Sequence, residues 1–272
     1  MGLKMNVDDQ RMSDLYPVWA NVRGTDEFGA YADLQIDEVT QRFRWVPPGT
    51  FQMGSPETEP MRFDHEIQHP VTLTRGFWLA DTVCTQALWE IFLGICISTA
   101  DLDRDHPMVG VNWNSVQAFL KGLNEAVPNL SARLPSESQW EYACRAGTTT
   151  PFSFGENITP EQVNYDGNYP YVGSKKGLYR RRTVPVKSLP PNPWGLFEMH
   201  GNVWEWCTDW FGAYPSQHVI DPSGPAMGTK RMLRGGSWFN IGRNVRSASR
   251  FVFVPAFRLD FIGLRLALGD VV

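Results

Sequence analysis

A histidine–glutamate motif is the first feature of this sequence that could carry out chemistry. The run HEIQH, which starts at His65, matches the H-E-x-x-H pattern. On a helix this spacing places His65 and His69 on one face as zinc ligands, with Glu66 as a general base. Pro60 and Pro70 flank the motif and a β-prone run follows it, so a sustained helix is not expected. We therefore interpret the motif as a polar loop and keep a zinc hydrolase as an alternative.

Other patterns for covalent or nucleotide chemistry are missing from the sequence. The chain contains no G-x-S-x-G motif, no P-loop and no G-x-G-x-x-G behind a strand. The remaining histidines, His106, His200 and His218, are scattered, which is typical of structural hydrogen bonding. The cysteines are too widely spaced for a C-x-x-C motif, and we expect them to be small buried hydrophobic residues. They are Cys84, Cys96, Cys144 and Cys207.

An oxygen-rich turn is a more credible candidate for a metal site. Glu198, Asn202 and Glu205 lie around the turn that precedes a tryptophan-rich run. Together with backbone carbonyls they would form the kind of ligand set that suits calcium. The alternative is that Glu205 caps or pairs inside the core.

The tail of the chain combines many apolar side chains with charges. FVFV at 251–254 is followed by Phe257, Leu259 and Phe261, with Pro255 and charged residues between them. One interpretation is a buried strand. A proline and alternating charges favour a loop instead, in which some of these apolar side chains are exposed. A contiguous exposed apolar patch indicates a binding surface.

Composition and charge limit the class of protein. The 272 residues suffice for one large domain or two small ones. Its 25 Lys and Arg against 29 Asp and Glu give a formal net charge of −4, so the chain has no broad electrostatic attraction to nucleic acid or to an anionic membrane. No apolar run is long enough to span a bilayer, and no signal segment opens the sequence. We expect a cytoplasmic location, or the cell surface or the exterior if a leader has been removed.

The 24 glycines, 20 prolines and 11 tryptophans predict a loop-rich α+β domain with short elements. We interpret residues 1–40 as an N-terminal extension, and we expect long ordered loops over 151–193. Helices are expected to begin at Thr85, at Asn114 or Ser115, and at Ser136, where Ser136 and Gln139 form a capping box. Leu88, Ile91, Phe92 and Ile95 would share one face of the first helix, and Val116, Phe119, Leu120 and Leu123 one face of the second. Strands are expected on both sides of Pro47-Pro48-Gly49 and at 71–80, 201–210 and 262–268, and the run RMLRGGSW at 231–238 is expected to be a strand that ends in a glycine bend.

Five ordered motifs resemble the formylglycine-generating enzyme, or sulfatase-modifying factor, family. They are FQMGS, RLPSESQWEYACRAGT, PNPWGLFEMHGNVWEW, RMLRGGSW and IGLRLAL, and they cover about Phe43 to Leu268. The resemblance implies a C-type-lectin-like α+β fold with bound calcium, whose ligands fall around Glu198, Asn202 and Glu205. A second calcium site of the family would start at Asn164 and Tyr165, but Lys175 and Lys176 stand near the place of its acidic ligand.

The same resemblance argues against the oxidase chemistry of the family. Its active members carry two cysteines shortly after the GGS motif, which bind copper and oxidise a substrate cysteine. Those places hold Asn240 and Val245 here. An amide or an isopropyl group cannot replace a thiolate ligand, so no copper is expected.

The tail is similar to targets of diversity-generating retroelements, which vary the 3′ end of a gene at adenines. The retained residues Asn240, Arg243, Arg246, Arg250 and Arg258 would then be scaffold. The free positions would bind the ligand, and each of their residue types can be encoded by a codon that ends in a pyrimidine. They are Phe239, Ile241, Asn244, Ser249, Phe251, Val252, Phe253, Val254, Phe257, Leu259, Asp260 and Phe261.

We therefore predict a C-type-lectin-like domain over 41–272 with a variable region at 239–261. It would be a non-catalytic protein that binds an unknown protein or cell-surface ligand, with no nucleic-acid partner and no membrane span. A family oxidoreductase with relocated chemistry remains an alternative, as does the zinc hydrolase at HEIQH.

Overall fold

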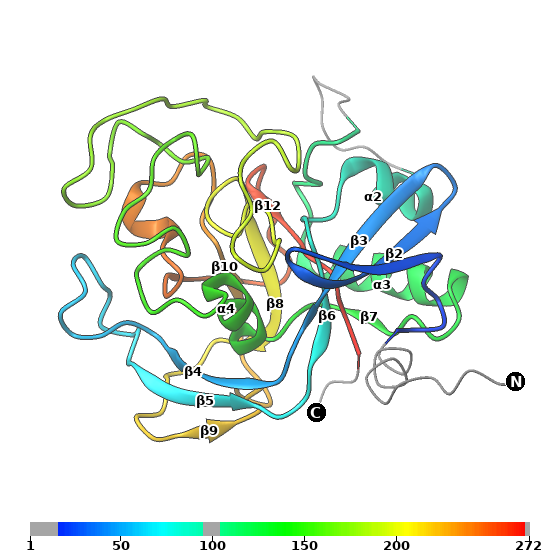
Figure 1. Ribbon diagram of the computed structural model, residues 1–272, viewed down its shortest axis with the longest axis horizontal. Helices are drawn as coiled ribbons and strands as arrows, with labels where there is room; N and C mark the ends of the chain where they lie inside the picture. The colour runs from blue at the N-terminus through cyan, green and yellow to red at the C-terminus, as the bar shows by residue number, and fades with distance from the viewer. Residues whose placement is uncertain (1–15, 95–103, 270–272) are drawn as a thin grey trace, which may run out of the picture.

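The computed structural model describes residues 16–94 and 104–269. Over these residues the chain forms three β-sheets, with helices and long loops packed around them. Figure 1 shows helices α2 and α3 beside the first sheet, and long loops at the opposite side of the molecule. The predicted mixture of short helices, short strands and loops is confirmed.

The first sheet begins in the segment that the sequence analysis assigned to an N-terminal extension. Its strand order is β1-β2-β3-β6-β13-β7 among the described residues. Residues 22–36 form β1 and β2, and β2 pairs with β3 over six residue pairs from Tyr31–Arg44 to Ile36–Val39. The sheet therefore starts well before residue 41. The strands are β1 Val22–Asp26, β2 Gly29–Ile36, β3 Val39–Val46, β6 Phe77–Ala80, β7 Ala132–Arg133 and β13 Ala267–Leu268.

The other two sheets divide runs that looked continuous in the sequence. The expected strand at 71–80 is two strands in different sheets, and so is the expected strand at 262–268. Trp204 and Trp206 of β8 are buried, whereas Trp210, beyond a shift in the register against β10, is only half-buried. The second sheet has the order β11-β10-β8-β12, from Arg250–Phe253, Arg231–Arg234, Trp204–Trp210 and Ile262–Gly263. The third has the order β4-β5-β9, from Gly49–Met53, His69–Leu73 and Val219–Ile220.

Helix starts follow side-chain capping. Thr85 caps α2 (Gln86–Leu93), and Ser136 with Gln139 forms the predicted capping box of α4 (Glu137–Arg145). The predicted start of α3 was wrong: this helix spans Trp113–Ala126, and its cap is Asn112, which forms a capping box with Ser115. The predicted inner face of α3 is buried, and Ile95 of the first predicted helix lies outside the described residues.

The chain between α4 and β8 folds without a helix or strand, although the structure describes all of it. This segment packs its own small core, in which Phe152, Tyr165 and Tyr171 are buried against Val245 from the far end of the sequence. The expected ordered loops at 151–193 are confirmed, and they lie against the segment that follows β10.

No helix in the described part of the chain is both long and apolar enough to cross a membrane.

Candidate binding surface

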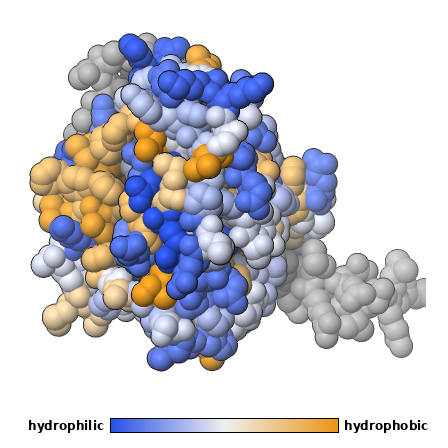
Figure 2. All heavy atoms as spheres, turned by 90° about the vertical axis from the view of Figure 1, so that its left-hand side faces the viewer, coloured by the Kyte–Doolittle hydropathy of each residue, from blue (hydrophilic) through white to orange (hydrophobic). Residues whose placement is uncertain are grey.

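The tail exposes most of the side chains that the sequence analysis assigned to ligand binding. Eleven of those twelve residues are exposed or half-buried, and Phe239, Phe251 and Phe257 are 39%, 38% and 51% exposed. Ser249 is the exception, because it is fully buried. Figure 2 shows that apolar side chains gather on one side of the molecular face that it presents, and that much of the rest of that face is hydrophilic. We use the name tail surface for the eleven outward residues between Phe239 and Phe261.

Aromatic rings connect the parts of the tail surface. Phe239 and Phe261 have ring centroids 4.5 Å apart. Phe251 stacks on the buried Trp204 at 5.1 Å and lies 5.7 Å from Phe253, which lies 4.8 Å from Phe257. The larger group of rings therefore rests on the buried Trp204 through Phe251. The tail is neither a wholly buried strand nor a free loop, because residues 250–253 form β11 at the edge of the second sheet.

A glycine bend after β10 turns the chain into this surface. Gly235 and Gly236 have φ values of 102° and 76°, which favour glycine. A Cβ atom on Gly236 would lie 2.5 Å from a methyl carbon of Val245 and 2.8 Å from the carbonyl oxygen of Asn244. The bend therefore brings the chain back onto the 3₁₀ turn η1 (Gly242–Val245).

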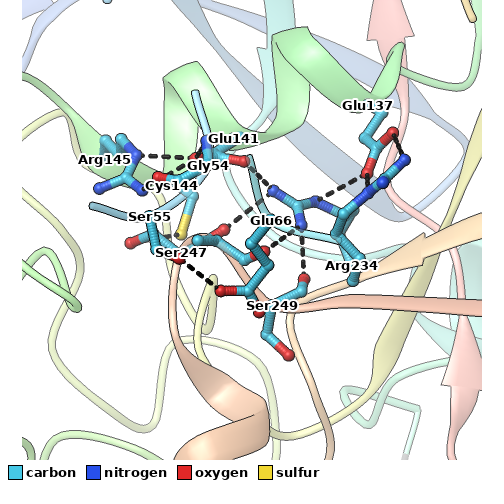
Figure 3. Close-up of polar contacts among 12 residues, drawn as sticks. Gly54, Ser55, Glu66, Glu137, Glu141, Cys144, Arg145, Arg234, Ser247 and Ser249 are labelled. Atoms are coloured by element: carbon cyan, nitrogen blue, oxygen red, sulfur yellow. Dashed lines mark hydrogen bonds and ion pairs between the residues drawn. The ribbon is translucent and has the colours of Figure 1, made fainter. Parts of the chain in front are cut away.

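Buried arginines hold the backbone below the surface. The guanidinium of Arg234 pairs with the Glu141 carboxylate and donates to the carbonyl oxygens of Ser247, Ala248 and Ser249. Figure 3 shows Arg234 between Glu141 and Glu137, with the 247–249 segment turned toward it. Three consecutive carbonyls thus depend on one cation, which fixes the path of the chain as it enters β11.

Two further arginines, at 246 and 250, continue this framework. Arg250 donates two hydrogen bonds to Glu137, at 2.6 and 2.9 Å. Burial alone would raise the pKa of Glu137, but the nearby Arg250 and Arg234 outweigh it and lower that pKa. The scaffold role that the sequence analysis gave to Arg250 fits this geometry. It does not fit Arg258, which is exposed.

Arg246 explains the HEIQH motif. Its guanidinium donates to both oxygens of Glu66, at 2.9 and 2.7 Å, and also to Glu59. Glu66 is fully buried, and His69 opens strand β5 with no helix between. The segment is not helical, as expected, but it is only in part the polar loop that we predicted, because Glu66 and His69 are buried and His69 belongs to a strand. The zinc alternative is wrong, because the proposed general base is already bound to an arginine.

The three predicted calcium ligands do not form a cation site. Both oxygens of Glu205 accept hydrogen bonds from Arg265, and one also accepts from Trp140. The side-chain oxygen of Asn202 accepts from the amide of Asn164 and from the backbone of Val184. Glu205 therefore pairs inside the core, which was the alternative interpretation, and this ligand set does not fit calcium.

Glu198, the third predicted ligand, is also buried but takes no part in the pairing of Glu205 with Arg265. One of its carboxylate oxygens accepts from the backbone N–H of Lys187 at 3.3 Å, and the other has no hydrogen-bond partner. Burial raises the pKa of Glu198 to about 7, so this carboxyl keeps its proton to a higher pH than an exposed glutamate does. Within 16–94 and 104–269, no three His, Cys, Asp or Glu side chains lie close enough together to hold a metal ion between them.

The positions of the family's copper-binding cysteines carry structural residues. The Asn240 side-chain oxygen accepts hydrogen bonds from Trp204 and from Ser237, and Val245 is fully buried. Neither residue supplies a soft ligand, so the arrangement does not fit copper. The described cysteines offer no substitute, since all are buried and unpaired and burial raises the pKa of each thiol. They are Cys84, Cys144 and Cys207, and Cys96 lies outside the described residues.

The scattered histidines have structural partners. The ring of His200 lies 3.6 Å from the Cys144 sulfur, accepts from the Ser153 N–H and contacts the Val245 carbonyl oxygen at 2.7 Å. Burial lowers the pKa of His200 to about 4, so this ring is neutral near pH 7. His106 and His218 are hydrogen-bonded to the hydroxyls of Thr183 and Thr72.

The fold and this site define a loop-rich α+β domain of the C-type-lectin-like type, with an apolar tail surface mounted on buried arginine–carboxylate pairs. The model of the sulfatase-modifying factor enzyme 1-like domain matches residues 32–269, and the chain belongs to this family. The predicted family and fold class are thus confirmed.

Curated relatives cover part of the chain. A formylglycine-generating enzyme of Streptomyces coelicolor is 39% identical over 173 residues, which make up 60% of this chain and 52% of that protein. The formylglycine-generating enzyme of Bos taurus is 33% identical over 60% of this chain and 44% of that protein. The chain therefore spans about half the length, or less, of these relatives.

Solved structures share the fold more completely. Treponema denticola variable protein 1 has a TM-score of 0.70 and 24% identity, over 88% of this chain and 99% of that one. PvdO from Pseudomonas aeruginosa has a TM-score of 0.68 and 24% identity, over 92% and 99%. At these identities the likeness concerns the fold.

Proposed function

We propose that this chain is a non-catalytic binding protein that presents a diversified ligand-binding surface at 239–261. One observation carries the proposal: the tail divides its side chains between two tasks. The buried ones hold the backbone with hydrogen bonds and ion pairs. The outward ones contribute apolar contacts only, as where Phe253, Leu259 and Phe261 pack partly against the core. Outward side chains of this kind can be exchanged while the fold persists.

The backbone beneath the surface is anchored at several points. The carbonyl oxygen of Leu259 accepts from Gly110, that of Pro255 accepts from Trp113, and that of Phe261 accepts from Trp204. A surface that is already ordered loses little conformational entropy when a ligand binds. Half-exposed phenylalanines on such a surface are suitable anchors for a partner.

Diversification is supported by the residue types and by resemblance. The outward positions match the free positions of retroelement targets, and a neighbour in fold is named a variable protein. The relatives named formylglycine-generating enzymes support the oxidoreductase alternative. However, the positions of the family's copper ligands hold Asn240 and Val245 in this chain. Stoichiometric copper or iron in the purified protein would favour that alternative.

Selection from a random phage-displayed peptide library tests the binding function. We expect peptides enriched on the full chain to lose binding to an aromatic variant, F239A/F251A/F257A. The variant should stay folded, with a Tm lowered by less than about 10 °C, because the three rings are already half-exposed. I220A/M227A, which removes exposed apolar side chains elsewhere, is the matched control and should bind as the full chain does. Unchanged peptide binding by the aromatic variant, or its unfolding, would contradict the proposal.

Diversification has its own test in the gene. Deep sequencing of the 3′ end across many cells of one population should find substitutions at adenines within the codons for 239–261. We expect the codon of the buried Ser249 to vary less than its neighbours. An invariant 3′ end would refute diversification and leave a binding surface of fixed sequence.

A further inference from the structure

A basic segment interrupts this acidic chain. Residues 167–197 contain no Asp or Glu but six Lys and Arg, in a protein with a formal net charge of −4. Lys187 pairs with Asp81 at 2.8 Å. Lys175, Lys176, Arg181 and Arg182 are exposed, and in the described part of the chain no carboxylate lies within salt-bridge distance of them. We refer to residues 175–182 as the basic loop.

The basic loop adjoins the tail surface. The ring of Tyr179 stacks on Trp238 with centroids 6.3 Å apart, and Trp238 contacts Phe239 at 5.7 Å. The guanidinium carbon of Arg181 lies 5.7 Å from the Tyr179 ring centroid. Aromatic contact therefore runs from the arginines of the loop to the first residue of the tail surface.

Backbone hydrogen bonds fix the chain just before this loop. The N–H of Gly242 donates to the carbonyl oxygen of Tyr169 at 3.0 Å, and the N–H of Asp166 donates to that of Asn240 at 2.8 Å. In Figure 1 the long loops after α4 run beside η1, in agreement with these bonds. The charged and apolar parts are thus attached to one framework.

We propose that the basic loop is the charged part of the binding surface, and that the partner is a protein that presents carboxylates beside an apolar contact. The inference rests on the proposed function, whose partner it specifies. Unpaired guanidinium groups match carboxylates in a two-pronged geometry, and charges at the rim of an apolar centre speed association and select partners.

The composition of the surface favours a protein over a nucleic acid. Its rings alternate with the aliphatic side chains of Ile241, Val252, Val254 and Leu259, which offer no stacking face to a base. Asp260 is exposed among them and would repel a phosphate backbone. An acidic patch on a protein, with its own apolar side chains, fits both halves of the surface.

The experiment uses a peptide selected from the random library on the full chain. We expect selected peptides to be enriched in Asp and Glu relative to the library. A version with each Asp and Glu changed to Asn and Gln should bind about tenfold more weakly. A basic-loop variant, K175Q/K176Q/R181Q/R182Q, should weaken binding of the acidic peptide by a similar factor.

A matched control separates local charge from net charge. The variant R23Q/R75Q/K121Q/K230Q removes the same number of exposed charges elsewhere and should bind the acidic peptide within about twofold of the full chain. Equal loss in both variants would overturn the inference.

The outcomes distinguish the two proposals. If the amide peptide binds as well as the acidic one, the carboxylate inference fails, while loss of binding by the aromatic variant still supports the proposed function. If the aromatic variant retains binding, or no peptide is enriched, the proposed function fails and the inference with it. Binding of random single-stranded DNA at physiological salt that the basic-loop variant abolishes would overturn the inference in favour of a nucleic-acid partner.

Discussion

The buried carboxylate of Glu66 and the guanidinium of Arg246 show how single residues connect distant parts of this chain. They lie 180 residues apart in sequence and join the loop before β5 to the end of η1. Because Arg246 also binds Glu59, removing its charge leaves two buried carboxylates without a cation. We expect R246M to lower the free energy of unfolding by about 3–5 kcal/mol, as measured by urea denaturation.

Arg258 provides the control for this prediction. It lies in the same tail and is exposed, so R258M should change the free energy of unfolding by less than about 0.5 kcal/mol. Similar losses in the two variants would mean that the Arg246 pairs do not stabilise the fold beyond an ordinary surface arginine.

At the scale of elements, the glycine bend after β10 controls how closely the tail returns to the second sheet. G236A would place a Cβ atom against Val245 and Asn244, whereas G147A would place one where nothing lies within 4 Å. Both glycines have positive φ, so both variants carry the cost of a left-handed backbone, about 1–2 kcal/mol. We expect G236A to lose about 2 kcal/mol more than G147A in chemical denaturation, because only it overpacks the bend.

Equal stability of the two glycine variants would contradict this interpretation. It would show that the chain after β10 can move away from the bend, and that the tail surface is not held as closely as the structure indicates.

Local signals in the sequence were sufficient for some elements. Ser136 with Gln139 and the lone Thr85 marked two helix starts correctly, because a cap acts within one turn. The start of α3 was missed because several capping residues follow one another there. Asn112, the residue that caps α3, also contacts the distant tail. Its side-chain amide donates to the carbonyl oxygen of Ala256, and the N–H of Trp113 donates to that of Pro255.

Sheet membership was not accessible in the same way. A period of two shows which face of a strand is buried but not which strand lies beside it. Strand β12 runs parallel to β8, while β13, a few residues later, pairs with β6 and β7. A single apolar run therefore supplies two sheets, and nothing within the run marks the division.

The candidate site was predicted in its exposed half only. The apolar residues among charges correctly indicated an exposed tail. The carboxylate of Glu205, however, was assigned to a calcium ion, whereas it pairs with an arginine. Glu205 in an oxygen-rich turn resembles a calcium ligand, and its actual partner Arg265 stands 60 residues later in the sequence. Such pairs depend on tertiary structure, and the spacing of residues gives no signal for them.

At the scale of the whole molecule, strands that follow one another closely in the sequence belong to different sheets. Ion pairs between arginines and carboxylates join the loops of these sheets. β2 contributes Leu34 to the same core cluster as Trp204 and Trp206 of the second sheet. The N-terminal strands therefore belong to the cooperative unit, and unfolding should be a single transition. Tryptophan fluorescence and far-UV circular dichroism should give the same urea midpoint.

Leu34 allows a direct test of this unity. The residue is 2% exposed, so L34A should cost about 2–5 kcal/mol, and L196A in the second core cluster should cost a similar amount. If the domain unfolds as one unit, each variant shifts the fluorescence and circular dichroism transitions together. If residues before 41 were an independent extension, L34A would leave the fluorescence midpoint of the tryptophan-rich β8 almost unchanged. The tail surface would then be held by the later strands alone, and the stability of the first sheet would not affect how many substitutions the tail surface tolerates.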